Sequence, residues 1–127
     1  MKILGIGIDI ISNKRIKFLI KKRLFISRTF SITEIKNSKK NMNKTNYFAK
    51  RFAAKESFAK ALGTGFRKGL NLKDIEILNE KNGKPYFLVT NKLDKIIFKE
   101  FNVKKYKLFL SISDEKDYSV AFTILQS

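Results

Sequence analysis

A short segment near the amino terminus constrains the fold more than any other part of the chain. Residues 3–11 alternate and are rich in branched apolar side chains, a pattern that predicts a β-strand. Because glycine weakens a strand, two glycines on one face indicate that something approaches the backbone closely there. Side chains two positions apart share a face, so the two faces are Leu4, Ile6, Ile8 and Ile10 on one side and Gly5, Gly7 and Asp9 on the other.

The position of Asp9 at the end of this bare glycine face leaves two interpretations open. An acid beside exposed backbone is a plausible ligand for a metal ion or another bound group. The alternative is a glycine bulge followed by an exposed aspartate at the end of the strand. Spacing alone does not decide between them.

The rest of the hydrophobic pattern predicts an α+β protein, with elements in mixed order and a single domain over residues 1–127. Expected helices run from Ser12 or Asn13 to about Leu24, from the capping box at Ser31–Glu34, over 47–62 and over 91–101. Asn91 is expected to cap the last of these helices, and Gly63 to end the one before it. The expected strands cover residues 75–78, 86–90, 107–113 and 118–125, and a polar loop is expected over 37–46.

Composition excludes several kinds of chemistry. The 127 residues include no cysteine and no histidine, so disulfides, thiolate or imidazole metal sites and a Ser-His-Asp triad are all ruled out. Catalysis must therefore use carboxylates, lysine, hydroxyls, backbone groups or a hard metal ion. The net charge is +17, and residues 1–73 hold 19 basic residues but only three acids. This distribution indicates an anionic ligand or partner.

The predicted helix over residues 47–62 carries the second set of candidate residues. Glu56 and Lys60 lie four positions apart and therefore share a face, which is also the pattern of an ordinary stabilising surface pair. A sharper interpretation uses the fact that Glu56 is the only acid on a helix that also carries Lys50, Arg51 and Lys55. A carboxylate that holds a hard cation beside several basic side chains is a common way to bind a polyphosphate.

The loop that follows this helix, Gly63-Thr64-Gly65-Phe66-Arg67-Lys68-Gly69, is rich in glycine and basic residues. It matches neither a dinucleotide-binding fingerprint nor a Walker A motif, because the spacing differs and the loop ends a helix instead of opening one. It is either a helix cap and turn or a backbone-rich surface for a phosphate.

Taken together, these motifs resemble the holo-[acyl-carrier-protein] synthases, the short 4′-phosphopantetheinyl transferases. The resemblance covers essentially the whole chain in order. It rests on four segments: Gly5-Ile6-Gly7-Ile8-Asp9-Ile10, Arg51-Phe52-Ala53-Ala54-Lys55-Glu56 with the residues through Gly65, Asn82-Gly83-Lys84-Pro85, and Ser111-Ile112-Ser113.

The resemblance implies a fold, a reaction and a set of site residues. The fold would be a small antiparallel or mixed sheet packed with helices. The reaction transfers 4′-phosphopantetheine from coenzyme A to a serine of apo-acyl carrier protein and releases adenosine 3′,5′-bisphosphate, with Mg²⁺ as cofactor, in fatty acid biosynthesis. The enzyme would be a homotrimer with each active site between neighbouring subunits. By position, the implied residues are Asp9 and Glu56 as magnesium ligands, Lys60 near the coenzyme A diphosphate, Arg51, Gly63, Gly65, Lys84, Pro85, Ser113 and Asp114 in coenzyme A binding, and Arg15 and Lys22 toward the carrier protein.

One departure from the family pattern stands at Asp114, where the family usually has histidine. An acid there cannot donate to a phosphate, so coenzyme A binding would be weaker, or Asp114 would join the metal shell. Two alternatives to the active enzyme follow: a catalytically impaired homologue that still binds carrier protein, and a small basic nucleic-acid-binding protein. No convincing targeting segment or membrane-spanning run is present, which favours a cytoplasmic protein without a membrane partner.

Overall fold

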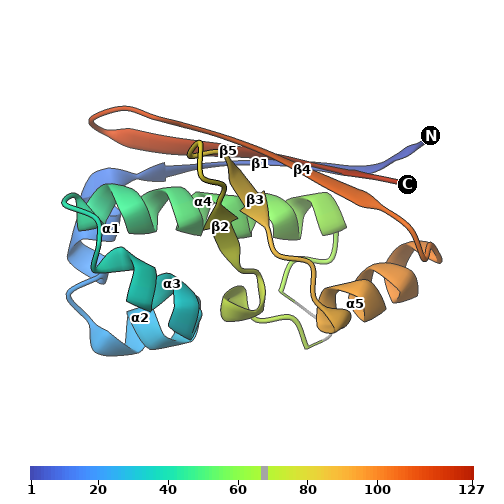
Figure 1. The fold of residues 1–127 in the computed structure, drawn as a ribbon, viewed down its shortest axis with the longest axis horizontal. Coiled ribbons are helices and arrows are strands. Elements are labelled where there is room, and N and C mark those ends of the chain that lie inside the picture. The colour runs from blue at the N-terminus through green and yellow to red at the C-terminus, as the bar shows by residue number, and fades with distance from the viewer. Residues whose placement is uncertain (67–68) are drawn as a thin grey trace.

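Helix α4 (Lys44–Leu62) forms the centre of the computed structural model, which describes residues 1–66 and 69–127. A three-stranded sheet lies along one side of α4, and the other helices lie on the opposite side (Figure 1). The remaining elements are β1 (Ile3–Ser12), α1 (Asn13–Leu19), α2 (Arg23–Thr29), α3 (Ile32–Ser38), the 3-10 turn η1 (Leu72–Asp74), β2 (Ile77–Asn79), β3 (Pro85–Phe87), α5 (Asn91–Phe101), β4 (Lys107–Asp114) and β5 (Tyr118–Gln126).

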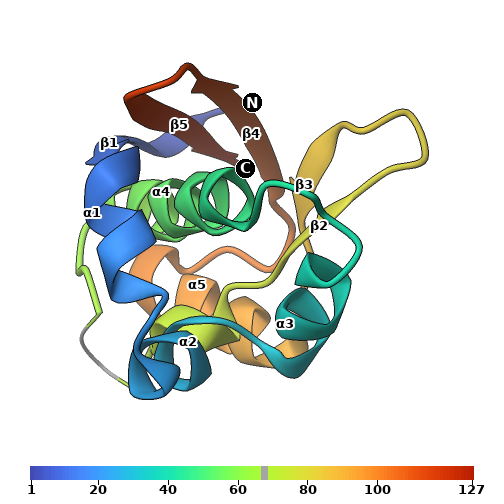
Figure 2. The ribbon, with the colours of Figure 1, turned by 90° about the vertical axis from the view of Figure 1, so that its left-hand side faces the viewer.

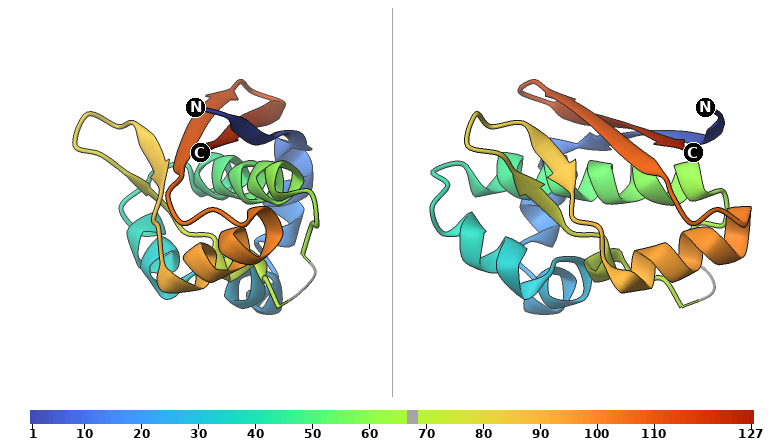
Figure 3. Two further views of the ribbon diagram at one scale, coloured as in Figure 1. Left: turned by 90° about the vertical axis from the view of Figure 1, so that its right-hand side faces the viewer. Right: turned by 45° about the vertical axis from the view of Figure 1, so that its right-hand side comes forward.

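All strand pairings in the described residues are antiparallel. The larger sheet has the order β1-β5-β4, so β5 is its central strand, and β2 and β3 form a separate hairpin. This hairpin projects beside α4 and away from the larger sheet (Figures 2 and 3). The α+β prediction is confirmed, and the sheets are antiparallel, which was one of the two expected forms.

Burial on nearly all sides sets α4 apart from an ordinary surface helix. Thirteen of its 19 residues are buried, and many of them are alanine or serine. The sheet residues that face α4 are also small, with Ser119, Ala121 and Thr123 fully buried on β5. Small side chains on both surfaces let the helix and the sheet approach closely. A buried hydrogen bond of 2.6 Å between Ser57 Oγ and Thr123 Oγ1 joins α4 to β5.

The bare face of β1 lies directly against the backbone of α4. A methyl group built on Gly7 would come within 1.9 Å of the Ser57 carbonyl oxygen, and one on Gly5 within 1.8 Å of the Ala61 carbonyl oxygen. The close approach expected from the glycine spacing is therefore confirmed, and the approaching group is a helix of the same chain. A bulge in the pairing of β1 with β5 also exists, but it lies between Ile3 and Gly5.

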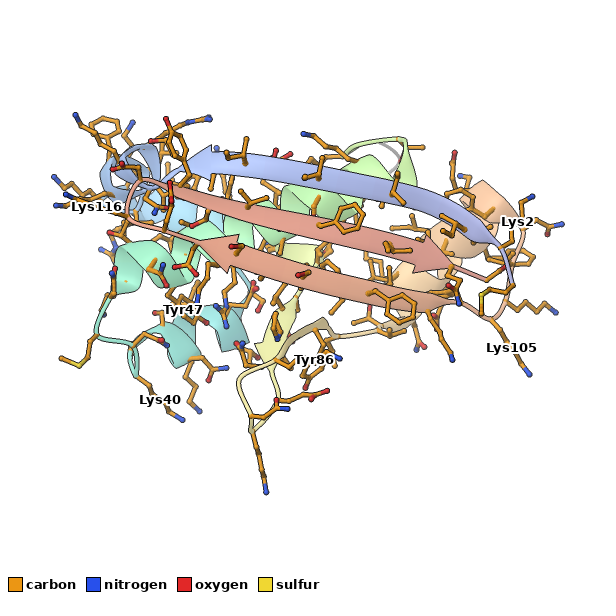
Figure 4. The ribbon with its side chains drawn as sticks, turned by 90° about the horizontal axis from the view of Figure 1, so that it is seen from above. Lys2, Lys40, Tyr47, Tyr86, Lys105 and Lys116 are labelled. Carbon is orange, nitrogen blue, oxygen red and sulfur yellow. The ribbon has the colours of Figure 1, made fainter. Side chains whose placement is uncertain are left out.

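The apolar face of β1 points away from α4 and is exposed. Ile6, Ile8 and Ile10 are 59%, 58% and 61% exposed. Ile8 is aligned with Phe122 on β5, which continues the apolar surface across the sheet. Figure 4 looks onto this outer face, with β1, β5 and β4 side by side. In a single chain, the sheet therefore has one buried face and one uncovered apolar face.

A buried ion pair holds α3, α4 and η1 together. Lys55 Nζ lies 2.7 Å from Glu34 Oε1, and both side chains are fully buried. Lys55 also donates to the carbonyl oxygens of Leu72 and Ile75, while Glu34 accepts from the backbone N–H of Ile77. The capping box expected at Ser31 and Glu34 is confirmed. Lys55 is thus a structural cation, and its sequence interpretation as part of a polyphosphate surface was wrong.

Several predicted boundaries differ from the structure. The helix expected to reach Leu24 ends at Leu19, and the chain turns through an extended Lys22 before α2 begins. After this turn Phe25 and Ile26 pack on the core, and Leu24 is left 64% exposed.

The loop expected over 37–46 is confined to residues 39–43, because α3 continues to Ser38 and α4 begins at Lys44. The Asn43 side chain accepts a hydrogen bond from the N–H of Asn46 and so caps α4 earlier than its apolar pattern suggests. Helix α5 has the predicted bounds, but Thr90 caps it in place of Asn91. Strand β2 begins two residues later than predicted, and β3 begins one residue earlier. Gly63 ends α4 with a φ of 86°, as expected.

We expect Gly7→Ala to destabilise the fold, because its methyl group would overlap the helix backbone, which cannot rotate away. The free energy of unfolding should fall by roughly 1–3 kcal/mol, as for other overpacked cores. Urea denaturation followed by circular dichroism measures this change. Gly63→Ala is the comparison, because nothing lies within 4 Å of the added methyl group. It should cost only the backbone strain, about 1 kcal/mol. Equal losses in the two variants would contradict close packing at Gly7.

Candidate active site

Three of the predicted site residues meet where β1 lies on α4. Asp9 is on β1, and Glu56 and Lys60 are on α4. Lys60 Nζ lies 3.2 Å from Asp9 Oδ1 and donates a 2.9 Å hydrogen bond to the Ile8 carbonyl oxygen. Among the described residues Lys60 forms its ion pair with Asp9 of β1. The Glu56–Lys60 surface pair that the spacing suggested is not formed there. The three residues constitute the carboxylate cluster.

The environment of Glu56 destabilises its ionised form. Burial raises the pKa of Glu56 above its ordinary value, and the nearby Asp9 carboxylate raises it further. Lys60 and Arg15 act in the opposite direction and lower it. An added cation is favourable beside Glu56, because its ionised form is destabilised and a second carboxylate lies nearby. Arg15, which the resemblance assigned to carrier-protein binding, therefore also lies near the cluster.

The donor set fits Mg²⁺. This ion prefers oxygen ligands and is commonly held by one or two carboxylates, with water and substrate phosphate completing its shell. The described residues contain no group of three acidic side chains that could share a metal ion, so the cluster offers Asp9 and Glu56 alone. Asp114 lies on β4, two strands away from β1, and does not join them. Within one chain Asp114 therefore does not share a metal site with Asp9 and Glu56, and its place in the metal shell stays a prediction.

Arg51 lies on a different side of α4 and is buried without a carboxylate partner. It is five positions before Glu56, which corresponds to about 140° around a helix. Its guanidinium stacks 3.7 Å from the ring centroid of Tyr47 and donates to the side-chain oxygen of Asn79. Its Nε atom is buried with no hydrogen-bond partner. Burial also lowers the pKa of Arg51. A cation held in this way has capacity left for an anionic ligand.

A pocket of about 140 Å³ lies beside Arg51. Its wall is completed by the β2–β3 hairpin, whose turn is tied to Asn79 by a 3.0 Å hydrogen bond to the Gly83 carbonyl oxygen. We call it the Arg51 pocket. Figure 4 labels Tyr47 and Tyr86, which mark the helix and the hairpin on either side of this region. The lining residues are Lys50, Arg51, Asn79, Gly83, Pro85, Ile112 and Asp114.

The structure separates the predicted coenzyme A residues into groups. Pro85 and Asp114 share the Arg51 pocket, whereas Lys84 is exposed in the adjoining turn. Ser113 points to the opposite face of β4 from Asp114, because successive strand residues alternate. Gly63 and Gly65 lie beyond the far end of α4, about 18 Å from Arg51 along the helix axis.

The remaining predictions from the sequence concern Lys22 and the basic loop after α4. Lys22 is exposed beside Phe18, with its Nζ 4.8 Å from the ring centroid. Arg67 and Lys68, from the basic loop, lie outside the described residues. Sequence reasoning missed Asn79 as a partner of Arg51, because no motif links the two residues. It also did not place Lys50 in a pocket with Arg51, although the two are adjacent in the chain.

Comparison with known proteins agrees with this arrangement. A sequence model described as the 4′-phosphopantetheinyl transferase superfamily matches residues 5–123. A holo-[acyl-carrier-protein] synthase from Pelagibacter ubique is 57% identical over 99% of this chain and 98% of its own length. The crystal structure of the synthase from Neisseria meningitidis has a TM-score of 0.88 and 39% identity, with 99% of this chain and 100% of that chain covered.

A structure of the Bacillus anthracis synthase, in complex with coenzyme A (3′,5′-ADP), has a TM-score of 0.81 and 35% identity and covers 98% of this chain and 97% of that chain. The fold is that of the phosphopantetheinyl transferases. The chain belongs to the 4′-phosphopantetheinyl transferase superfamily. None of the helices in the described part of the chain is long and apolar enough to cross a membrane.

We expect Glu56→Gln to stabilise the protein at neutral pH while it impairs the site. Because the pKa of Glu56 is raised in the folded state, protonation of this carboxylate favours folding. This contribution to stability is complete below the ordinary pKa of 4.5 and is lost as the pH rises through the raised pKa. At pH 7 the ionised carboxylate therefore costs stability, and the amide does not. Thermal unfolding should show a higher midpoint for the variant at pH 7, and a difference that shrinks toward pH 4.

Glu80→Gln is the matched control, because Glu80 is an exposed carboxylate on the hairpin. This variant should leave the midpoint unchanged at both pH values. A Glu56→Gln midpoint that is lower than wild type at pH 7 would show that Glu56 is stabilised as an anion, contrary to the electrostatics of the cluster.

Proposed function

We propose that this chain is an Mg²⁺-dependent holo-[acyl-carrier-protein] synthase. It transfers 4′-phosphopantetheine from coenzyme A to a serine of apo-acyl carrier protein and releases adenosine 3′,5′-bisphosphate. The observation that carries the proposal is the convergence of Asp9, Glu56 and Lys60 from two elements, in a chain that shares its whole length with named synthases. The role in fatty acid biosynthesis, the cytoplasmic location and the single-domain organisation over residues 1–127 belong to the same proposal.

The reaction replaces the phosphoanhydride bond of coenzyme A with a phosphodiester bond to serine. The serine hydroxyl oxygen of the carrier protein bonds to the phosphorus that carries pantetheine, and the bond from that phosphorus to the leaving phosphate oxygen breaks. Asp9 and Glu56 would hold Mg²⁺, which when bound polarises the phosphoryl group. Lys60 offsets the negative charge of the diphosphate. Glu56, a carboxylate of the same cluster, is in our proposal the group that accepts the serine proton.

The Arg51 pocket suits a second anionic group of the same co-substrate. Coenzyme A carries a phosphate monoester on its ribose in addition to the diphosphate. Arg51 is buried, lacks an acidic partner and has one N–H without an acceptor, so a phosphate oxygen would complete its hydrogen bonds. Lys50 adds a second positive charge. We assign the ribose phosphate to this pocket, with Pro85 in its wall. Gly63, Gly65, Lys84 and Ser113 remain predicted coenzyme A contacts.

Two features of the chain support an assembly in which copies of it share each active site. The first is the uncovered apolar face of the sheet, centred on Ile8 and Phe122, which a second copy would cover. The second is that the carboxylate cluster and the Arg51 pocket lie on different sides of α4, whose body is about 10 Å across. One coenzyme A molecule would reach both groups more readily when they come from neighbouring subunits. The trimeric form of this assembly is taken from the family resemblance.

The basic surface of α1 and α2 is the proposed docking area for the carrier protein. Arg15 and Lys22 are exposed on it, together with Lys14 and Arg23. Carrier proteins of this kind are acidic, so positive charge next to the cluster favours their approach. Because Arg15 also lowers the pKa of Glu56, the docking area adjoins the reacting groups.

The activity itself is tested by the intact mass of apo-acyl carrier protein after incubation with the protein, coenzyme A and Mg²⁺. We expect a gain of one phosphopantetheine that EDTA abolishes and that Glu56→Gln reduces by orders of magnitude. A gain that survives EDTA would contradict the metal assignment. No gain from a folded protein that still binds the carrier would identify the catalytically impaired homologue instead.

The shared active site is tested by mixing inactive subunits. Glu56→Gln should be inactive alone, and Arg51→Met should be strongly impaired when coenzyme A is kept below its KM. Arg51→Met should fold because it removes a buried charge that has no acidic partner. Co-assembled at equal amounts, they should recover about a quarter of the wild-type sites, because one interface in four combines both intact halves. The control pairs Glu56→Gln with Asp9→Asn, which damage the same half and should recover nothing. Equal recovery in the two mixtures, or none in hybrids verified by native mass spectrometry, would contradict a site shared between subunits.

A further inference from the structure

The Arg51 pocket contains a carboxylate that a phosphate site would not be expected to have. Asp114, at the end of β4, lines the same pocket as Lys50 and Arg51. A phosphate monoester carries up to two negative charges at neutral pH. A fixed carboxylate in the pocket wall therefore opposes the attraction that the two cations provide.

Local structure keeps this carboxylate in place. Asn46 donates a side-chain hydrogen bond to Asp114 Oδ2. Asn46 is in the first turn of α4, where the unpaired backbone N–H groups favour a negative charge. Asp114 is thus held in place by interactions that do not depend on a ligand.

The carboxylate does not pair with the cations beside it. The ion pairs formed among the described residues join Lys55 to Glu34, Lys60 to Asp9 and Lys92 to Asp74, and none of them includes Asp114, Lys50 or Arg51. Asp114 therefore reduces the positive potential of the pocket, but it does not occupy either cation in an ion pair. The cations remain available to an incoming anion, at a lower affinity than they would have alone.

We propose that Asp114 is a specificity-determining residue that weakens selection for a co-substrate with a ribose phosphate, so that coenzyme A and its 3′-dephospho form are used more equally. This inference rests on the proposed function and on the assignment of the ribose phosphate to the Arg51 pocket. It concerns only the part of the co-substrate remote from the reacting phosphorus. The carboxylate cluster is unaffected, because Asp114 lies two strands away from it.

The test compares coenzyme A with 3′-dephospho-coenzyme A in the wild-type protein and in Asp114→Asn. Asparagine keeps an oxygen that can accept the hydrogen bond from Asn46, so the variant should fold. We expect the ratio of kcat/KM for the two co-substrates to rise about tenfold in favour of coenzyme A, through KM, with kcat little changed. An unchanged ratio, or a change confined to kcat, would overturn the proposal.

Matched controls separate a local effect from a general change of charge. Glu115→Gln and Asp117→Asn remove the same charge from the turn between β4 and β5, and these residues line a neighbouring pocket but not the Arg51 pocket. Both variants should leave the ratio at its wild-type value. A rise of the same size in either control would overturn a specific role for Asp114.

A binding measurement distinguishes failure of this inference from failure of the proposed function. Calorimetry without carrier protein gives the affinities for adenosine 3′,5′-bisphosphate and for adenosine 5′-monophosphate. Asp114→Asn should strengthen binding of the bisphosphate about tenfold relative to the monophosphate, even if the chain proves unable to transfer phosphopantetheine. Parallel changes in both affinities would overturn the inference whether or not the chain is active.

Discussion

The contact between the glycine face of β1 and the backbone of α4 is the constraint on which the site depends. With methyl groups excluded at Gly5 and Gly7, the strand rests directly on the helix carbonyls. This brings Asp9, whose side chain is short, within reach of Lys60 on the helix. The same packing places Asp9 close enough to Glu56 to raise its pKa. Two carboxylates on different elements are therefore brought together by two glycines, which have no side chains.

Different sides of helix α4 carry different charged groups. One side carries the carboxylate cluster, another holds Arg51 against Tyr47 and the hairpin, and Lys55 is buried with Glu34. The buried ion pair connects the helix to α3 and η1. Because the helix is buried on nearly all sides, each of its buried charged residues must have a defined partner or leave a polar group unsatisfied.

Much of the fold was predictable because it depends on local patterns. The strand at 3–11, the capping box at Ser31, the end of α4 at Gly63 and the bounds of α5 all follow from periodicity and capping chemistry. The break between α1 and α2 was not predictable, because the apolar stripe from Ile16 to Leu24 is continuous in the sequence. Only packing against the rest of the core selects Phe25 and Ile26 over Leu24. The early start of α4 was missed because its first turn is polar, and the cap at Asn43 compensates for that.

The sequence by itself determined the chemical inventory and the family. The lack of histidine and cysteine left carboxylates, lysines and a hard metal ion, and the motif order identified the phosphopantetheinyl transferases. Tertiary structure decided which of these groups meet. Lys55, adjacent to Glu56 in the chain, is turned into the core, whereas Asp9, 47 positions from Glu56, lies beside it. It also placed Asp114 with Arg51 and away from Asp9 and Glu56. Spacing along the chain indicates which residues share a face of one helix or strand, but only packing between elements decides what that face contacts.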